Sequence, residues 1–271
     1  MNASLPPKNK NLGQHFLHQK SVIDSIIATV SPDTDAIWEI GPGMGALTSK
    51  LSLLNKKLIL FEKDSRFFDH LNQFSQNLIK GDFLKVDLEQ IAKDLHPEME
   101  SKKNFKLTVI SNLPYNVSSQ IFIKLLKFNH IHEMTLMYQK EVGEKTISHE
   151  LDESNLSSLS ILSSLFFDAK KLLIVHPAAF TPPPKVQSIV IHYQKKEKSL
   201  IPLSDFIQME KLLRLLYGQP RKQLAHLVKT SEQSRLAEYF SKHQLLQARP
   251  ANLTLNHILE IFKIYYTKDF N

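Results

Sequence analysis

The residues best suited to chemistry stand in one run of four, Asn112-Leu113-Pro114-Tyr115. The Asn112 side chain carries an oxygen acceptor, and the Tyr115 ring offers a flat face for stacking. Pro114 has a fixed φ and no N–H, so the turn is stiff and a neighbouring carbonyl can point outward as a second acceptor. Two acceptors beside an aromatic face suit a planar base that carries an amino group. The same residues also make an ordinary turn at a strand end, so the run alone leaves both interpretations open.

The elements that flank this run place it where ligands bind. The β-branched segment 107–111 predicts a strand, and apolar residues at helical spacing between Ile121 and Phe128 predict a helix. The run therefore lies at the carboxyl end of a strand in an α/β pattern, which is where open α/β sheets bind their ligands.

A glycine-rich turn upstream occupies the same position in its own strand–helix unit. The segment Gly41-Pro42-Gly43-Met44-Gly45-Ala46 follows a predicted strand over 36–40 and precedes a predicted helix over 47–54. Its spacing fits G-x-G-x-x-G/A, so a dinucleotide site such as one for NAD is one interpretation. Glu62 ends the next predicted strand, about 20 residues further on, where an acid can hold the hydroxyls of a ribose.

A third strand end carries another acid. Asp82 follows a short predicted strand over 78–80 and precedes Phe83. The carboxylate could pair with an adenine amine while the ring stacks on the base. Asp82 could equally be the N-cap of the following turn, and the sequence leaves these two roles open.

Two further segments could close over a ligand. The arm 13–17, Gly-Gln-His-Phe-Leu, precedes a predicted helix over 21–30 and could cover a site or simply pack through its apolar residues. The proline-rich loop 177–186 is stiff and predicts a rigid presentation of Phe180.

Composition and charge narrow the class of protein. The chain of 271 residues has no cysteine, which excludes disulfides, thiolate catalysis and cysteine-based zinc sites and fits a reducing cytoplasm. No apolar run approaches the ~20 residues of a membrane helix. Residues 195–271 hold 13 Lys and Arg against 7 Asp and Glu, whereas residues 1–194 hold 21 against 20. A basic excess confined to one end indicates a polyanionic partner, most simply nucleic acid, although a solvated lysine-rich face is the alternative.

The order of elements predicts an α/β domain followed by a helical one. Strands and helices alternate up to residue 193, and the charged segment 195–202 breaks the pattern. We therefore expect a catalytic domain over 1–197 and a helical domain over 198–271. The helices of the second domain are predicted at 204–217, 221–230, 233–242 and 254–266.

Taken in order, these motifs resemble the KsgA/RsmA family, the ribosomal RNA adenine N6,N6-dimethyltransferases. The resemblance covers nearly the whole chain and rests on residues 11–17, 39–43, Glu62, Asp82, 112–115, 139–142 and 180–186. It implies a Rossmann-like, S-adenosylmethionine (SAM)-dependent methyltransferase sheet of the doubly wound type with a small C-terminal all-α domain. It also implies SAM as cofactor, 16S rRNA in the small ribosomal subunit as partner, dimethylation of two adjacent adenosines, and a monomer.

The resemblance assigns roles to individual residues. The cofactor residues that it implies are His15, Leu17, Gly41, Gly43, Glu62, Asp82 and Asn112. Asn112, Pro114, Tyr115 and Phe180 would form the catalytic site, with the target base between Tyr115 and Phe180. The candidates for phosphate contacts are Lys8, Lys10, Lys185, Arg221 and Lys222.

Two departures from the family pattern bear on these roles. His15 stands where many relatives have Asn, although its ring can still donate and accept hydrogen bonds. The basic cluster reads Gln219-Pro220-Arg221-Lys222, with one arginine fewer than in relatives and a proline that predicts the start of the next helix.

Other classes of protein remain open on the sequence alone. A 23S rRNA adenine methyltransferase of the resistance type, a DNA adenine enzyme, an NAD-dependent oxidoreductase and an inactive ribosome-assembly factor on the same fold share parts of the pattern. A metal enzyme is disfavoured, because His15 with His18 and His130 with His132 are the only close histidine pairs.

Overall fold

The protein is described by a computed structural model that covers residues 14–102, 104–147, 156–219, 221–228 and 234–266. Contacts divide the chain into two units, one of Met1–Gly143 with Ala169–Lys195 and one of Glu144–Asp168 with Lys196–Asn271. The functional features predicted at the strand ends all belong to the first unit.

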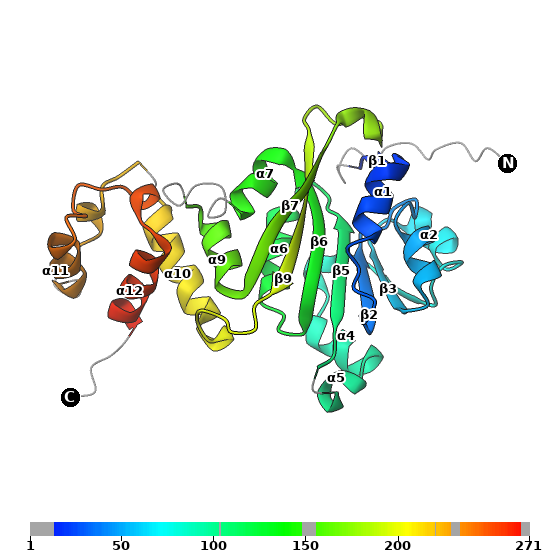
Figure 1. The fold of residues 1–271 in the computed structure, drawn as a ribbon, viewed down its shortest axis with the longest axis horizontal. Coiled ribbons are helices and arrows are strands. Elements are labelled where there is room, and N and C mark those ends of the chain that lie inside the picture. The colour runs from blue at the N-terminus through cyan, green and yellow to red at the C-terminus, as the bar shows by residue number, and fades with distance from the viewer. Residues whose placement is uncertain (1–13, 103, 148–155, 220, 229–233, 267–271) are drawn as a thin grey trace. The chain divides into compact units, whose positions relative to one another are not determined.

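The first unit is built on a seven-stranded sheet in the order β4-β3-β2-β5-β6-β9-β7 (Figure 1). The first five of these run parallel, and β9 pairs antiparallel with β6. The chain winds outward from β2 to β4 on one side and then returns to β5 and β6 on the other, so the order reverses between β2 and β5. The strands are β2 (Ala36–Ile40), β3 (Lys57–Glu62), β4 (Asn77–Lys80), β5 (Leu107–Asn112), β6 (Ile131–Gln139), β7 (Phe167–Val175) and β9 (Ser188–Lys195).

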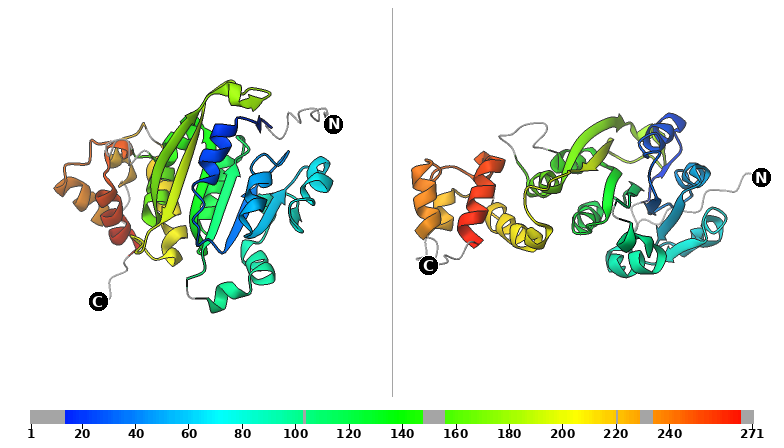
Figure 2. Two further views of the ribbon diagram at one scale, coloured as in Figure 1. Left: turned by 45° about the vertical axis from the view of Figure 1, so that its right-hand side comes forward. Right: turned by 60° about the horizontal axis from the view of Figure 1, so that its bottom comes forward.

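Helices cover both faces of this sheet (Figure 2). On one face, α1 (Lys20–Ile27) and α2 (Thr48–Leu51) bury Ile26 and Leu51 in a cluster with Ile37 of β2. Successive residues of a strand point to opposite faces, so Trp38 lies on the other side, stacked on Phe128 with ring centroids 5.3 Å apart. The doubly wound α/β class predicted from the sequence is confirmed.

The remaining helices of the first unit are short or cap the sheet on its second face. Phe122 of α6 (Ser118–Leu126) packs on Tyr138 and Tyr193, at 6.0 and 5.1 Å between ring centroids. Between β3 and β4 the chain forms a 3-10 turn, whose start is capped by Asp64, and then one α-turn. The other elements are η2 (Ser52–Leu54), η3 (Ser65–Phe67), α3 (Phe68–Leu71), η4 (Phe83–Lys85), α4 (Leu88–Leu95), α5 (Glu98–Ser101), α7 (Lys140–Thr146) and η5 (Pro177–Ala179).

A separate two-stranded sheet joins the N-terminal arm to the proline-rich loop. β1 (Phe16–Leu17) pairs antiparallel with β8 (Phe180–Thr181), with Leu17 opposite Phe180. The His18 N–H also donates to the Ala179 carbonyl at 3.0 Å. Residues more than 160 positions apart in the chain are thus held side by side by backbone hydrogen bonds.

The second unit is helical. It contains α9 (Ser158–Phe166), η6 (Leu203–Asp205), α10 (Phe206–Tyr217), η7 (Leu224–Leu227), α11 (Ser234–Lys242), η9 (Pro250–Asn252) and α12 (Leu255–Tyr266). Phe166 stacks on Phe206 at 5.7 Å, so α9 joins the C-terminal helices although it precedes β7 in the chain. Sequence order alone could not reveal that α9 belongs with these helices. The predicted division into 1–197 and 198–271 places α9 in the first domain instead.

The helix predicted over 221–230 is wrong within the described residues. Arg221 and Lys222 lie in a turn, and only the 3-10 helix η7 follows. Instead, backbone N–H groups of this segment donate to another part of the chain. Leu224 and Ala225 donate to the carbonyls of Ala248 and Leu246 at 2.9 and 3.0 Å. These tertiary bonds replace the ladder of a longer helix.

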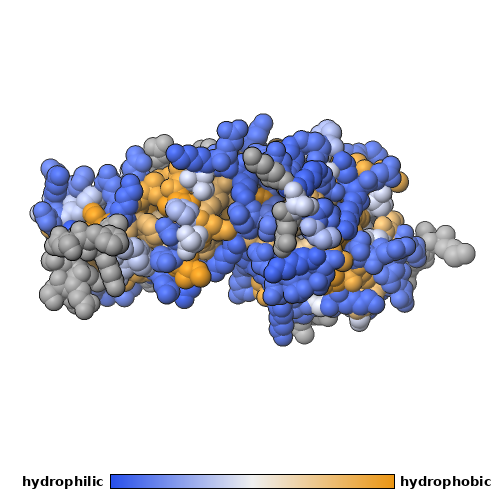
Figure 3. Space-filling model, turned by 90° about the horizontal axis from the view of Figure 1, so that it is seen from below, coloured by the Kyte–Doolittle hydropathy of each residue, from blue (hydrophilic) through white to orange (hydrophobic). Residues whose placement is uncertain are grey.

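Within the described ranges, none of the helices combines the length and the apolar character needed to cross a bilayer. On the face drawn in Figure 3, hydrophilic residues cover much of the surface and apolar residues gather in smaller areas.

The packing of α7 on the sheet generates a test of the fold. A Cβ on Gly143 would lie 2.2 Å from Cγ2 of Ile189, a β-branched methyl that cannot rotate away cheaply. We expect Gly143→Ala to lower the free energy of unfolding by about 1–3 kcal/mol, as overpacked cores do. Urea unfolding monitored by circular dichroism would measure the loss. The exposed Glu141→Ala on the same helix serves as control, and equal unfolding midpoints for both variants would contradict the packing described.

Candidate functional site

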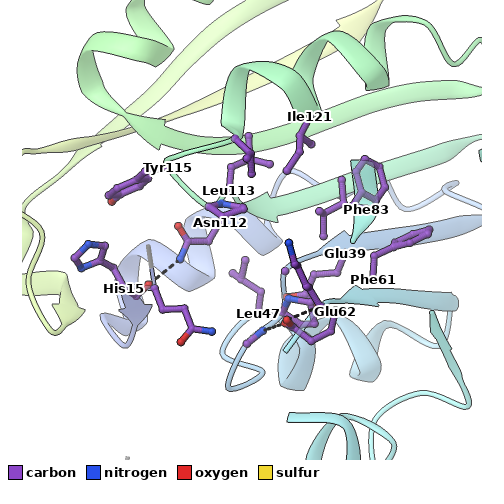
Figure 4. A pocket seen from close by; sticks show the side chains of 18 of the residues that line it. His15, Glu39, Leu47, Phe61, Glu62, Phe83, Asn112, Leu113, Tyr115 and Ile121 are labelled. Atoms are coloured by element: carbon purple, nitrogen blue, oxygen red, sulfur yellow. Dashed lines mark hydrogen bonds between the residues drawn. The ribbon is translucent and has the colours of Figure 1, made fainter. Parts of the chain in front are cut away.

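A cavity lies at the carboxyl ends of β2, β3, β4 and β5 (Figure 4). Its empty volume is about 1180 Å³, open solvent at the mouth included. It sits at the point where the strand order reverses, which is where doubly wound sheets bind ligands. The structure brings nine of the predicted site residues together in its wall: His15, Leu17, Gly41, Gly43, Glu62, Asp82, Asn112, Pro114 and Tyr115.

The glycine turn and Glu62 form one corner of the cavity. Gly43 has a φ of +55°, which favours glycine, and its N–H donates to Oε2 of Glu62 at 2.9 Å. Oε1 of Glu62 accepts the N–H groups of Lys63 and Asp64 at 2.8 and 2.7 Å. Burial raises the pKa of this carboxyl, and the three N–H donors oppose that effect. Since a carboxylate offers about four lone-pair sites, one acceptor site on Oε2 remains, and Glu62 lines the cavity.

Asp82 combines the two roles that the sequence left open. Its Oδ1 accepts the Leu84 N–H at 3.0 Å, so it is the N-cap of η4, and it also lines the cavity. Its Oδ2 pairs with Nζ of Lys63 at 2.8 Å, and this bond lowers the pKa of Asp82. The carboxylate is therefore charged and fixed in place at the cavity wall.

Asn112 is oriented by the N-terminal arm. Its Nδ2 donates to the backbone carbonyl of His15 at 3.2 Å. Because that bond uses the nitrogen of the amide, Oδ1 of Asn112 points away from the His15 carbonyl. Figure 4 shows the amide and its hydrogen bond to His15. The arm thereby decides which end of Asn112 a ligand meets.

His15 also covers the ring of Tyr115. The two rings are stacked with centroids 5.3 Å apart, and Nδ1 of His15 lies 2.7 Å from the Pro182 carbonyl, to which it donates. His15 thus links the arm, Tyr115 and the proline-rich loop rather than pairing with His18. In the part of the chain that the structure describes, no group of three or more His, Asp and Glu is placed to hold a metal ion.

Of the two aromatic residues expected to enclose a base, the cavity wall contains Tyr115 and not Phe180. Tyr115 lines the cavity, and its hydroxyl is 2.6 Å from Oγ of Ser188. Phe180 is 2% exposed and belongs to the apolar core, because its strand pairs with β1 beside Leu17. Phe180 is therefore buried behind the wall in this conformation, and His15 is the ring that stacks on Tyr115.

The arm is anchored a second time, through Gln14. Its Nε2 donates to Oδ2 of Asp64 at 2.7 Å, and its Oε1 accepts from Arg66 at 3.0 Å. The Arg66 guanidinium holds the pKa of Asp64 down at about 2, with Gln14 contributing. Gln14 lines the cavity as well. From the sequence, only the arm 13–17 as a whole was expected to cover a site, with no separate role for Gln14.

Glu39 is the second cavity residue that sequence reasoning missed. It is the penultimate residue of β2, is 1% exposed, and accepts a hydrogen bond from Oγ1 of Thr48 at 2.7 Å. Burial raises its pKa to about 8, and the neighbouring Glu62 adds to the rise. The signal was present, because an acid within the apolar run Ala-Ile-Trp-Glu-Ile is out of keeping with a buried strand.

None of the predicted RNA-contacting residues that the structure describes is part of the cavity wall. Lys185, Arg221 and Lys222 are exposed, and Nζ of Lys222 lies 3.0 Å from Nε2 of His226. Lys8 and Lys10 lie outside the described residues.

Comparisons with known proteins identify the family. The model of the Ribosomal RNA adenine dimethylase family matches residues 6–267. A Ribosomal RNA small subunit methyltransferase A from Ureaplasma urealyticum is 33% identical, over 97% of this chain and 94% of its own length. The protein of that name from Flavobacterium johnsoniae is 32% identical, over 92% of each chain.

Solved structures agree with the fold. A dimethyladenosine transferase from Plasmodium falciparum matches with a TM-score of 0.71 and 26% identity, covering 91% of this chain and 96% of that one. The 23S rRNA methyltransferase ErmE matches with a TM-score of 0.66 over 93% of this chain and 100% of that one. At 20% identity, the ErmE match speaks for the fold alone.

The buried Glu39 predicts a specific pH dependence of stability. Its pKa of about 8 in the folded chain exceeds the ordinary 4.5, so the folded state holds a proton that the unfolded state has released. Stability from this group is full below about pH 4.5 and is lost as pH rises to about 8, by at most about 1.4 kcal/mol per pH unit. We expect Glu39→Gln to remove this slope in urea unfolding between pH 5 and pH 8. Parallel curves for the variant and the native chain would show that Glu39 is ionised in the folded state.

Proposed function

Because the chain belongs to the ribosomal RNA adenine dimethylase family, we propose that it transfers methyl groups from SAM to N6 of two adjacent adenosines near the 3′ end of 16S rRNA. The observation that carries the proposal is the orientation of Asn112, whose amide nitrogen is held by the His15 carbonyl. Its oxygen is then the end available to accept a hydrogen bond from an exocyclic amine, beside the ring of Tyr115.

The cavity residues suit SAM rather than a phosphate-bearing cofactor. Glu62 has an acceptor site left for a ribose hydroxyl, and the charged Asp82 can accept from the adenine amine. Phe83 and Ile121 supply apolar walls, and the glycine turn carries no lysine of the kind that binds phosphates. When bound, SAM supplies a methyl group on a positively charged sulfur.

The residues of the turn prepare the adenine nitrogen for attack. Hydrogen bonds from N6–H to Oδ1 of Asn112 and to a backbone carbonyl favour a tetrahedral nitrogen whose lone pair is released from the ring. The Pro114 carbonyl already accepts the Val117 N–H at 3.2 Å, which leaves the Leu113 carbonyl as the better second acceptor. Little acid–base chemistry is needed, so positioning and electrostatics supply the rate. A monomethylated amine keeps one N–H, which it can donate to one of these two acceptors in the second transfer.

The position of His15 affects how a base can enter. The target base is flipped out of its stack at a cost of a few kcal/mol, and stacking on Tyr115 returns roughly 1–3 kcal/mol. Since the imidazole lies on Tyr115 in this conformation, the base either displaces it or stacks beyond it. Phe180 joins the stack only if β8 releases it from the core.

The exposed basic residues suit the RNA partner. We assign Lys185, Arg221 and Lys222 to phosphate contacts and residues 198–271 to RNA binding, since the chain beyond residue 194 carries most of the positive excess. The reaction would take place on a small subunit during its assembly in the cytoplasm, with the chain acting as a monomer.

Methylation assays separate this proposal from its rivals. Transfer to immature small subunits with no transfer to naked 23S RNA is the expected result. The reverse preference would favour a resistance-type enzyme, and binding of the small subunit without any transfer would favour an inactive assembly factor.

The role of Asn112 can be tested directly. We expect Asn112→Ala to lower the turnover number by about a hundred-fold or more, because the amine loses an acceptor in the transition state. Incorporation of labelled methyl groups into small subunits measures the effect. Asn72→Ala, an exposed asparagine after α3, is the control for loss of an amide. Unchanged turnover in a folded Asn112→Ala protein would remove this residue from the mechanism.

The basic residues predict a steep salt dependence. RNA affinity should fall linearly on a logarithmic scale as salt rises, and Arg221→Gln or Lys222→Gln should each reduce the slope by about one. Filter binding of a small-subunit rRNA fragment at several salt concentrations measures both slopes. A flat dependence, or slopes identical to those of the native chain, would exclude these residues from phosphate contact.

A further inference from the structure

Lys124 connects the two turns that border the cavity. It lies on α6, which begins at Ser118, three residues after the catalytic turn ends at Tyr115. Its Nζ donates to the carbonyls of Phe83 and Leu84 at 2.7 and 3.1 Å and also to the carbonyl of Val86. Figure 4 draws Ile121, one turn earlier on α6, on the side of the cavity where Phe83 lies.

The ammonium group matches the demands of this segment. The 3-10 turn η4 is short: its Phe83 carbonyl accepts the Val86 N–H at 3.3 Å, and each carbonyl can accept more than one hydrogen bond. An ammonium carries three N–H donors, and here three carbonyls receive them. Nζ also lies 5.2 Å from the centre of the Phe83 ring, close enough for a cation–π contact. Burial lowers the pKa of Lys124, and Asp87 and Asp82 counter that effect.

Phe83 is thereby fixed from two sides. Its ring meets Phe61 edge-on, with centroids 5.1 Å apart and planes at 87°. Lys124 holds the same ring from the side of α6 and holds the backbone that follows it. Asp82, Phe83 and Phe61 line the cavity, whereas Lys124 does not.

We propose that Lys124 is a positioning residue for the adenine end of the cofactor, which it sets by fixing Asp82 and Phe83 against α6. The proposal rests on the proposed SAM site and adds a residue outside its wall. It also gives the cofactor a mechanical link to the catalytic turn, because the helix that carries Lys124 starts where that turn ends.

A purely structural role would look different in one respect. Loss of a structural lysine would lower the unfolding temperature and leave ligand affinity unchanged in the folded protein. Loss of a positioning residue lowers affinity for any ligand with the adenine half, whether or not the amino-acid half is present. Methylthioadenosine, which has the adenosine and no amino acid, separates the two halves.

The experiment uses Lys124→Met, which keeps the length of the side chain and removes its donors. Calorimetric titrations of the full chain measure the dissociation constants of S-adenosylhomocysteine and methylthioadenosine. We expect both to rise by about ten-fold or more. The KM for SAM should rise in step, and the turnover number at saturating SAM should stay within about two-fold.

Two further variants keep the test decisive. Lys56 donates to the Pro32 carbonyl at 2.8 Å, away from the cavity wall, so Lys56→Met controls for loss of a lysine–carbonyl bond and should leave both constants unchanged. Lys124→Arg keeps the charge, but its planar head cannot reproduce three converging bonds, so an intermediate rise is expected even if Lys124→Met does not fold. Native affinity in Lys124→Arg and in any folded Lys124→Met would overturn the proposal, as would a fall in turnover without a change in KM. Failure of the native chain to bind S-adenosylhomocysteine would instead overturn the proposed cofactor.

Discussion

One hydrogen bond sets the chemistry of the site: the amide nitrogen of Asn112 donates to the His15 carbonyl. An amide presents a donor at one end and an acceptor at the other, and a cavity that binds an amine needs the acceptor. The arm that supplies the carbonyl is itself held at Gln14, at His15 and through the pairing of β1 with β8. The polarity that the Asn112 amide presents at the proposed catalytic site therefore depends on a segment far away in sequence.

The sheet gathers the other polar groups and supplies each with partners. Glu62 accepts hydrogen bonds from three backbone N–H groups. Asp82 accepts one backbone N–H and pairs with a lysine, and Glu39 accepts a hydrogen bond from a threonine hydroxyl. Glu39 and Glu62 are buried, and this burial raises their pKa values. In such a region of low polarity, polar contacts to a ligand are stronger than in water. Aromatic side chains on the second face, among them Trp38 and Phe61, fix the strands from which these acids project.

Much of this arrangement could be predicted from the sequence, and the failures have physical causes. The strand ends carrying Gly41, Glu62, Asp82 and Asn112 were predicted because hydrophobic runs and turn residues are local signals. The pairing of β1 with β8, which buries Phe180 and lays His15 on Tyr115, arises from contacts between distant segments that no local pattern encodes. The helix expected over 221–230 gave way to tertiary backbone bonds, and α9 joined the C-terminal helices through Phe166 and Phe206 for the same reason.

The most direct test removes the exocyclic amine of the target adenosine and the side-chain amide of Asn112, first separately and then together. Binding of an rRNA hairpin is measured in the presence of S-adenosylhomocysteine, with the target adenosine either intact or replaced by purine riboside, which lacks the exocyclic amino group. We predict that this replacement weakens binding to the native chain more than it weakens binding to the Asn112→Ala variant, in which the amine has lost the Asn112 contact and keeps only the one to the Leu113 carbonyl. An equal loss in both proteins would mean that the amine meets another partner, and the oriented amide would no longer explain the reaction.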